Sequence, residues 1–443
     1  MSAAPELNVF DCPLDGIRLI EASAGTGKTW NICGLYLRLL LERELPVEAL
    51  LVVTFTKAAT AELSGRIRER IVETLRVLDG AAAGDDPFVP QLLDTLRARG
   101  IDDARTSVRL RHALQTFDEA AIFTIHGFCQ RALADTPFAA GLPYALELVE
   151  DDDALRLEVA QDFWRREVAG SALPPLLADE LLNRGDCPAG WAGILQRHMG
   201  RPCARALWDE GTDGGEGAAA LPAAEARLRQ AYAAARALSE RLDEAVACVN
   251  GALDGLNGTR YKPQAIGTAA GQWAGWLAAD DPLQPIAGEH GDKLRLFAAE
   301  VLKQGITAAG SRKGIAAPCH PFFDAAGELL AARAEVDALL ATARLSLLRR
   351  FVDTAADELR RRKAERRQIG FDDILWNAWQ ALHAGGQPWL AAALHARYPV
   401  ALIDEFQDTD PLQFGIFDRI YRAEGRHGSL FLVGDPKQAI YSF

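Results

Sequence analysis

The 443-residue sequence contains no apolar run of about 18 residues, the length that a membrane-spanning helix needs. Its first residues, MSAAPELNVFDC, lack the basic and apolar segments of a secretion signal. The seven cysteines are scattered without a CxxC pair, and the eight histidines form no HxxxH or Cys/His cluster. These absences argue against a membrane protein, a disulfide framework and a structural zinc site, and we expect a protein of the reducing cytoplasm.

An excess of positive charge is also missing, because 48 Lys and Arg residues stand against 61 Asp and Glu residues, a formal net charge of −13. This balance argues against a protein that coats nucleic acid by bulk charge, but it leaves room for a local basic channel. The apolar fraction of 49% and the charged fraction of 25% are those of a soluble globular protein. At about 150 residues per domain, the length predicts two to four domains.

Short apolar runs alternate with helical patterns in the two outer parts of the chain. The candidate strands are Ile17–Ser23, Ala49–Thr56, Ala120–Ile125, Pro399–Ile403 and Ser429–Val433. Helical spacing of apolar residues follows the first run directly and covers residues 58–78 after the second. Strands that are apolar throughout and alternate with helices predict an α/β fold, with a parallel sheet that is covered on both faces.

The middle of the chain differs, because Ala, Leu, Arg and Glu recur there at helical spacing without a convincing strand. Two Gly- and Pro-rich stretches, DEGTDGGEGAAALP and AADDPLQPIAGEHGD, interrupt this pattern as loops. We predict a mostly helical insertion domain at residues 146–345. It would separate the first part of a sheet-forming domain, residues 1–145, from its second part, residues 346–443.

The stretch ASAGTGKT matches the phosphate-binding pattern GxxxxGK[ST], except that Ala22 replaces the first glycine. It lies between a predicted strand and a predicted helix, where backbone N–H groups and the helix dipole can bind phosphate. Lys28 would neutralise the phosphates and Thr29 would ligate Mg²⁺. We therefore predict a site for ATP and Mg²⁺ formed by Ala22, Ser23, Ala24, Gly25, Thr26, Gly27, Lys28 and Thr29.

An acidic pair follows a buried strand in ALIDEFQD, as the metal side of such a site requires. Asp404 would hold Mg²⁺, and Glu405 would polarise the attacking water as a general base. Lys28 and Asp404 are 404 − 28 = 376 positions apart, yet they must meet around one ion. The sheet must therefore be interrupted by a large insertion, in agreement with the helical middle.

Six stretches together resemble the motifs of superfamily 1 DNA helicases of the UvrD/Rep kind, namely IEASAGTGKT, VVTFT with AATAEL, FTIHGFCQR, GFDD, IDEFQDTDP and GDPKQAIY. Within them, the combination resembles the RecB (beta) subunits of RecBCD-type exodeoxyribonuclease V. The resemblance covers the outer thirds of the chain, and the middle follows only from its position as an insertion. It implies a RecA-like P-loop NTPase fold. Lys57 departs from the acidic residue expected there, which bears on backbone contact beside Thr56 but not on ATP binding.

The resemblance also implies roles for further residues. Gln407 and Gln438 would sense the γ-phosphate, with Gln438 counted among the catalytic residues, and Asp435 would face the nucleotide. The residues expected at single-stranded DNA are Thr54, Phe55, Thr56, Thr124, His126, Phe128, Tyr441 and Phe443, the last two by stacking on bases. Taken singly, such aromatics are more often core residues and His126 a structural histidine; the motif context favours the DNA role.

A basic run, Arg360–Lys363 with Arg366 and Arg367, precedes GFDD. It either lies along a phosphate backbone or forms a solvated helix face. The sequence leaves both interpretations open, because acidic residues are interleaved upstream.

The resemblance implies an ATP-dependent 3′-to-5′ DNA helicase motor that acts in double-strand break repair and recombination. Its partners would be DNA, as a single strand and at the duplex junction, and RecC-like and RecD-like subunits. The family takes its arginine fingers from residues that follow the last motif, and its nuclease domain lies far C-terminal, so we expect an N-terminal portion without either. The alternatives are an ATP- and DNA-binding fragment without helicase turnover, and a UvrD- or AddA-like motor outside RecBCD. A P-loop kinase or transporter ATPase would need neither Gln407 nor the QAIY loop.

Overall fold

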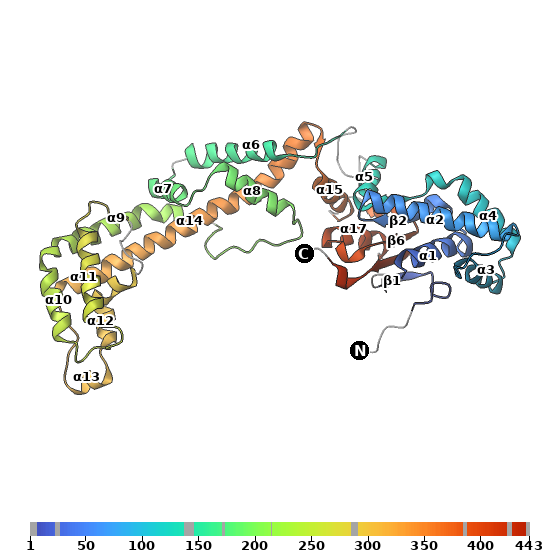
Figure 1. Ribbon diagram of the computed structural model, residues 1–443. Coiled ribbons are helices and arrows are strands. Elements are labelled where there is room, and N and C mark those ends of the chain that lie inside the picture. Colours follow the sequence, from blue (N-terminus) through green and yellow to red (C-terminus); the bar gives the residue numbers. More distant parts are fainter. Residues whose placement is uncertain are drawn as a thin grey trace. The chain divides into compact units, whose positions relative to one another are not determined.

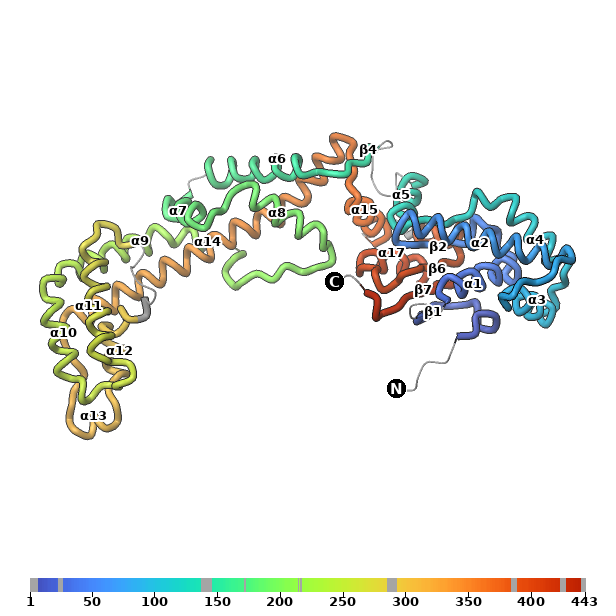
Figure 2. The backbone as a smooth tube through the Cα atoms, in the orientation of Figure 1, coloured from blue at the N-terminus to red at the C-terminus, as the bar shows by residue number. Residues whose placement is uncertain are grey.

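The structure is a computed structural model that describes residues 7–22, 27–136, 146–170, 173–213, 215–284, 291–383, 388–422 and 428–439. The chain divides into two compact units, each shown in Figures 1 and 2. Unit 1 comprises Met1–Asp152, His198–Ala204 and Leu359–Phe443, and unit 2 comprises Asp153–Arg197 and Arg205–Glu358. The domain boundaries expected at residues 145 and 345 stay a prediction, and one helix, α14 (Pro321–Glu365), continues across the second.

Unit 1 is built on a five-stranded sheet in the order β1-β7-β6-β2-β3, and every neighbouring pair is parallel. The strands are β1 (Gly16–Glu21), β2 (Leu50–Thr54), β3 (Ile122–Thr124), β6 (Val400–Ile403) and β7 (Ser429–Gly434). Strands β1 and β7 come from opposite ends of the chain and lie side by side, as the trace in Figure 2 shows. The predicted α/β fold with a parallel sheet is confirmed.

Both faces of the sheet are covered, because successive side chains of each strand point to opposite faces. Leu50 and Val52 pack into one core, whereas Leu51 and Val53 pack into the other. The first core is completed by α1 (Lys28–Glu42), α2 (Lys57–Leu78), α3 (Phe88–Ala98) and α4 (Asp103–Gln115). The second is completed by α5 (Ile125–Asp135), α15 (Phe371–His383), α16 (Pro388–Arg397) and α17 (Pro411–Tyr421). The prediction of a sheet with helices on both faces is therefore confirmed.

A second, two-stranded parallel sheet in unit 1 was not predicted from the sequence. It pairs β4 (Glu147–Leu148) with β5 (Gln368–Ile369). Each strand has only two residues, which is too short for an apolar pattern to reveal it. The pairing joins the segment that leads into unit 2 to the segment that returns from it.

Unit 2 is mostly helical, as predicted. Its helices are α6 (Asp153–Trp164), α7 (Pro175–Asn183), α8 (Pro188–Met199), α9 (Glu216–Ala237), α10 (Leu242–Gly251), α11 (Pro263–Leu277), α12 (Ala299–Gly305), α13 (Ala308–Arg312) and the greater part of α14. Its core is rich in aromatic rings: Trp273 stacks on Trp276 at 5.4 Å between centroids and meets Phe322 edge-on at 5.3 Å. In the part of unit 2 that is described, the isolated bridge between Leu256 and Ile306 is the one β-type pairing.

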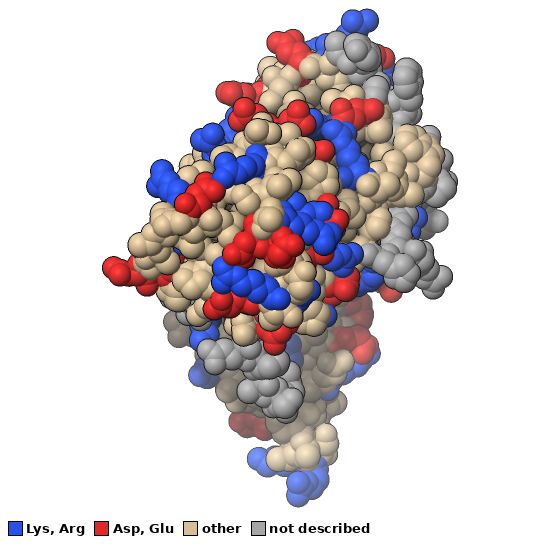
Figure 3. Space-filling model, turned by 90° about the vertical axis from the view of Figure 1, so that its right-hand side faces the viewer, with Lys and Arg blue, Asp and Glu red and all other residues tan. Residues whose placement is uncertain are grey.

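No described helix combines the length and the apolar character that crossing a membrane would take. The surface at the end of unit 1 that carries α3 and α4 mixes basic and acidic side chains, as Figure 3 shows. Ion pairs account for much of this mixing: Arg97 lies 2.8 Å from Asp103, and Arg111 lies 2.5 Å from Asp79. This face therefore presents no broad surface of one charge.

Candidate nucleotide and DNA site

The parallel sheet brings residues from distant parts of the chain to one edge. Parallel strands end at the same edge, and functional residues of α/β proteins gather outside those ends. At this edge β1 leads to the predicted phosphate loop, β6 leads to Asp404, and β7 leads to Asp435. The order β1-β7-β6 places the end of β7 between the other two.

The phosphate loop is described at its two ends. The Ala22 N–H donates a hydrogen bond to the Gly434 carbonyl at 3.0 Å, which ties the loop to the end of β7. Gly27 has a φ of 81°, in the left-handed region that favours glycine, and it precedes Lys28, the first residue of α1. Thr29 is half-buried on the same first turn. Of the predicted nucleotide residues, Ser23, Ala24, Gly25 and Thr26 lie outside the described residues.

Lys28 and Glu405 form an ion pair across 377 positions of sequence, with 2.7 Å between Lys28 Nζ and Glu405 Oε2. Gln407 extends the contact, because its Nε2 donates to the same Glu405 oxygen at 2.6 Å. The Gln407 Oε1 accepts a hydrogen bond from the Asp435 backbone N–H at 2.9 Å. One continuous network thus links the helix after β1, the turn after β6 and the end of β7.

The backbone supports this network through two special positions. Glu405 has a φ of 52°, a left-handed conformation that costs a non-glycine residue about 1–3 kcal/mol and is found mostly at functional sites. Gly434 lies so close to Gln407 that a Cβ at this position would be 2.6 Å from the Gln407 Oε1. A larger residue at position 434 would therefore displace the glutamine that joins Glu405 to Asp435.

The two acidic residues after β6 have opposite pKa shifts. Burial, together with the neighbouring Glu405 charge, raises the pKa of Asp404 to about 6. Burial alone would also raise the pKa of Glu405, but hydrogen bonds from Gln407 and Lys28 and the charge of Lys28 lower it. Glu405 is thus an ionised carboxylate at neutral pH, whereas Asp404 takes up a proton in mildly acidic solution.

The described members of the predicted DNA set lie around the ends of β2 and β3 at the same edge. The Thr56 side chain accepts from the Ala59 N–H at 3.0 Å and begins α2; the Thr124 side chain accepts from the Gly127 N–H at 3.0 Å and begins α5. Phe55 and His126 are half-buried. The strand ends therefore carry both helix caps and partly exposed rings close to the nucleotide network.

Two of the predicted DNA contacts need correction. Phe128 is 1% exposed, and its ring stacks on Phe417 in the core at 5.5 Å, so it is unavailable to a DNA base. Thr54 is fully buried, and its hydroxyl lies 2.5 Å from the Thr60 hydroxyl. Phe128 therefore packs α5 against the core, and Thr54 bonds to the first turn of α2. Tyr441 and Phe443 lie outside the described residues.

Gln438 is half-buried, and its backbone N–H donates to the Asp435 carbonyl at 2.9 Å in the short helix Pro436–Gln438. The role of this glutamine in sensing phosphate stays a prediction. The sequence reasoning did not include Phe371, the first residue of α15, among the site residues. Its ring is 44% exposed and meets His126 edge-on at 6.1 Å. The GFDD motif contained the signal, since it is a glycine followed by an aromatic residue at a helix start.

Comparison with known proteins agrees with this geometry. The family model of the UvrD/REP helicase N-terminal domain matches residues 5–188 and 324–443. The two matched segments contain all five strands of the large sheet, and the break between them falls in unit 2 except for His198–Ala204, which belongs to unit 1.

Several RecB subunits of bacteria are similar to this chain over almost its whole length. The RecBCD enzyme subunit RecB of Escherichia coli K12 is 36% identical over 456 residues, which cover 99% of this chain and 35% of that protein. The RecB subunit of Haemophilus influenzae is 32% identical, over 100% of this chain and 38% of that protein. The RecB subunit of Mycobacterium tuberculosis is 28% identical, over 96% of this chain and 26% of that protein. The chain therefore spans about a third of the length of these relatives, and it belongs to the family of UvrD/REP helicase N-terminal domains.

Proposed function

We propose that the chain is the ATP-binding part of an ATP-dependent 3′-to-5′ DNA helicase motor of the RecBCD exodeoxyribonuclease V type. Such a motor would act in double-strand break repair and recombination. The observation that carries the proposal is the network of Lys28, Glu405, Gln407 and Asp435 at the edge of the sheet. Phosphoryl transfer from a nucleotide requires a P-loop lysine and an acidic residue after a buried strand to lie at one site, and Lys28 and Glu405 meet here.

In the proposed reaction the Lys28 ammonium binds the terminal phosphates of ATP. Because the same ammonium contacts Glu405 at 2.7 Å, arriving phosphate competes with the carboxylate for it. Glu405, ionised at neutral pH, accepts a proton from the attacking water as general base. Gln407 holds the Glu405 carboxylate and the start of the Asp435 turn together, so that a change at the phosphate is transmitted to the end of β7.

The donor atoms of the site fit Mg²⁺, a hard cation that prefers oxygen ligands. The Asp404 carboxylate and the Thr29 hydroxyl would hold the ion, which would neutralise charge on the phosphate oxygens. The raised pKa of Asp404 agrees with this fit, because a buried carboxylate without a cation favours its protonated form.

DNA would bind along the ends of β2 and β3, where Phe55, Thr56, Thr124 and His126 lie. Contacts of this kind combine backbone hydrogen bonds with stacking on bases and therefore tolerate any sequence, as a translocating motor needs. RecC-like and RecD-like subunits would be its protein partners, by analogy with the RecBCD enzyme whose RecB subunits the chain resembles. A reducing cytoplasm would be its location.

The test is Lys28→Ala against Arg68→Ala in the 443-residue chain, with binding of a fluorescent ATP analogue and ATP turnover measured with and without oligo(dT). Arg68 is an exposed cation of the same unit, within α2 and away from the predicted nucleotide and DNA residues. We expect Lys28→Ala to lower turnover by about 10²–10³, because it removes a positive charge aimed at the reacting phosphates, and Arg68→Ala to retain it. Equal turnover in wild type and Lys28→Ala would refute the assignment. Nucleotide and DNA binding without turnover in the wild type would favour the binding-fragment alternative.

A further inference from the structure

Lys363 is a buried cation on the last turn of α14, within the basic run of residues 360–367. The residue is 4% exposed, and its Nζ lies 2.6 Å from Asp373 Oδ2 and also pairs with Asp152. It therefore neither lies along a phosphate backbone nor belongs to a solvated helix face. Its neighbour in the run, Arg360, lies 4.6 Å above the Trp376 ring.

Burying an ammonium group is costly unless anionic partners compensate for the lost water. The two partners are themselves nearly buried, since the Asp373 side chain is 8% exposed and that of Asp152 is 14% exposed. Asp373 is also committed to the backbone, because its Oδ2 accepts a hydrogen bond from the Gly370 N–H at 2.9 Å. A Cβ at position 370 would lie 3.1 Å from that oxygen and 3.3 Å from the Lys363 Nζ. Asp152, Asp373 and Gly370 therefore fit closely around one charge.

The cluster lies where the chain leaves unit 1 and where it returns. Asp152 is the last residue of unit 1 before unit 2, and Lys363 follows soon after the return at Leu359. The backbone also joins these segments: the Glu147 N–H donates to the Arg367 carbonyl at 2.7 Å, and the Val149 N–H donates to the Ile369 carbonyl at 2.9 Å. The outgoing and returning segments are thus fastened together by strand pairing and by one buried ammonium.

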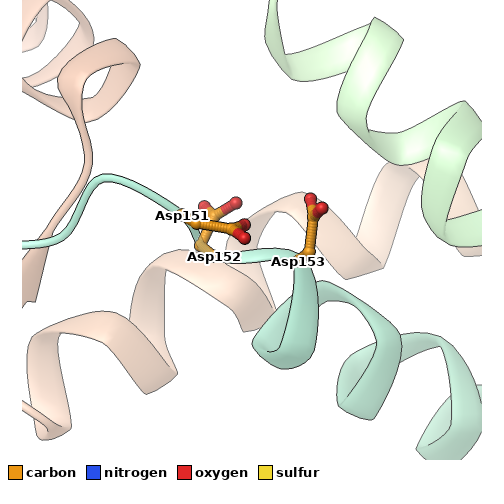
Figure 4. Close-up of side chains that lie close together, drawn as sticks. All are labelled: Asp151, Asp152 and Asp153. Carbon is orange, nitrogen blue, oxygen red and sulfur yellow. The ribbon is translucent and has the colours of Figure 1, made fainter.

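Three successive carboxylates stand at this crossing, as Figure 4 shows for Asp151, Asp152 and Asp153. Their oxygens lie within 4.8 Å of one another. Asp152 pairs with Lys363, and Asp153 pairs with Arg156 on the following turn. Side-chain cations of the protein thus meet the charges of Asp152 and Asp153, and the cluster gives no reason to place a metal ion there.

The Lys363 cluster determines how α15 begins. Asp373 closes the first turn of this helix onto Gly370, and the same turn carries Phe371 and Asp372. Phe371 meets His126 edge-on after the end of β3. Burial lowers the pKa of His126, and the Asp372 charge lies close enough to oppose this shift in part. A shift of the first turn of α15 would therefore move Phe371 and Asp372, the two neighbours of the His126 ring on this helix.

We propose that Lys363 is a positioning residue for single-stranded DNA binding. Through Asp152 and Asp373 it fixes the first turn of α15, and this turn fixes Phe371 against His126. The inference rests on the proposed function, since it requires that the sheet edge binds DNA. It adds a residue that touches neither DNA nor nucleotide and acts through α15.

The experiment compares Lys363→Met with Arg361→Met in the 443-residue chain. Arg361 is a matched control, because it lies half a turn away on α14 and pairs with Glu365 in an exposed i,i+4 contact. The measurements are oligo(dT) affinity, affinity for a fluorescent ATP analogue, and hydrogen exchange of residues 366–376. For Lys363→Met we expect about tenfold weaker oligo(dT) binding, nucleotide affinity within twofold of wild type, and faster exchange across the start of α15. Lys363→Arg, which retains the charge, should recover part of the DNA affinity.

Two results would overturn the inference. One is that Lys363→Met binds oligo(dT) as Arg361→Met does; the other is that it loses nucleotide and DNA affinity equally, as a general loss of structure would cause. If Lys363→Met does not fold, Asp152→Asn decides, because it keeps the Asp373 contact. We expect about threefold weaker DNA binding for Asp152→Asn, and unchanged binding would refute the proposal. Absence of oligo(dT) binding by the wild type would instead refute the DNA part of the proposed function, and this inference with it.

Discussion

Unit 1 and unit 2 use their polar side chains in different ways. In unit 1, Lys28, Glu405 and Gln407 bond to one another although they come from opposite ends of the chain. In unit 2, Asp186 accepts a hydrogen bond from the buried Trp191 Nε1 at 2.9 Å and pairs with Arg344. The first group is an ionic network open to a ligand, whereas the second fixes an aromatic core.

The difference follows from architecture. Parallel strands end at one edge of a sheet, so polar residues placed after several strands converge whatever their separation in sequence. Helices pack through apolar stripes along their length, and their polar residues point outward on separate faces. A chain that combines both can therefore change the helical part without touching the chemistry. We expect substitutions at the sheet edge of unit 1 to alter turnover, whatever their effect on stability, and substitutions in the core of unit 2 to alter stability alone.

The largest effect is expected for Glu405→Gln in unit 1. Glutamine retains the size and hydrogen bonding of the side chain but cannot accept the proton of the attacking water. We expect turnover of ATP to fall by about 10²–10⁴, the range for loss of a general base, while affinity for a fluorescent ATP analogue is retained. Glu48→Gln serves as the control, because Glu48 is an exposed position of unit 1. Gln413→Glu would be less informative, because Gln413 is buried in the capping box of α17. Undiminished turnover of Glu405→Gln would remove it as the base.

The matching experiment in unit 2 is Trp273→Ala. Trp273 is fully buried, stacks on Trp276 and donates from Nε1 to the Leu294 carbonyl at 3.1 Å. We expect the free energy of unfolding of unit 2 to fall by about 3–5 kcal/mol, as for other buried aromatic truncations. Affinity for the ATP analogue should stay within twofold of wild type. Leu207→Ala, at a position that is 87% exposed, should change neither quantity.

The contrast between the sheet edge and contacts elsewhere in the chain also explains which parts of the structure could be predicted from the sequence. The sheet was predictable because buried parallel strands are apolar throughout, although β3 stops at Thr124, earlier than the predicted Ile125. Thr124 ends the strand because its hydroxyl accepts from the Gly127 N–H and starts α5. The meeting of Lys28 with the acidic pair was also predictable, because phosphate chemistry requires it.

Other contacts could not be predicted, because their partners are distant in sequence and follow no repeating pattern. Lys363 looked like one cation among several, and nothing near it in the sequence indicates Asp152 as a partner. Phe128 belongs to a motif whose other members we expect at DNA, but α5 places it in the core beside Phe417. The buried residues of α5, Ile125, Phe128, Cys129 and Leu133, recur at helical spacing, so the periodicity of this segment, unlike its motif, does indicate the core position of Phe128.

A smaller effect in unit 1 concerns the stability of the protein without nucleotide or metal. The pKa of Asp404 is raised from an ordinary 3.8 to about 6, so the folded state binds more protons than the unfolded state between these values. Stability from this group is therefore lost as pH rises from about 4 to about 6. Asp404→Asn cannot ionise, so it should be more stable than wild type, by on the order of 1–2 kcal/mol at pH 5 and 2–3 kcal/mol at pH 7.5.

Urea unfolding in EDTA at these two pH values measures the difference, with Asp118→Asn, an exposed carboxylate of unit 1, as control. A variant that gains stability while losing Mg²⁺-dependent turnover would show that Asp404 is kept for chemistry and not for folding. A difference between Asp404→Asn and wild type that does not grow with pH would contradict the burial of its charge.

The smallest effect is expected in unit 2, at the ion pair between Arg227 on α9 and Glu335 on α14. Both side chains are about half exposed, so water and salt screen their attraction, and such pairs contribute about 0–1 kcal/mol. Arg227→Ala should therefore lower the free energy of unfolding by less than about 1 kcal/mol, and this loss should shrink in 0.5 M salt. In contrast, Arg344→Ala removes the partner of Asp186, whose side chain is only 7% exposed, and should cost about 3–5 kcal/mol, because it leaves one charge uncompensated. If both substitutions had the same cost, the exposed pairs of unit 2 would be structural elements of its fold, and the division between a chemical sheet edge and a helical scaffold held by its core would fail.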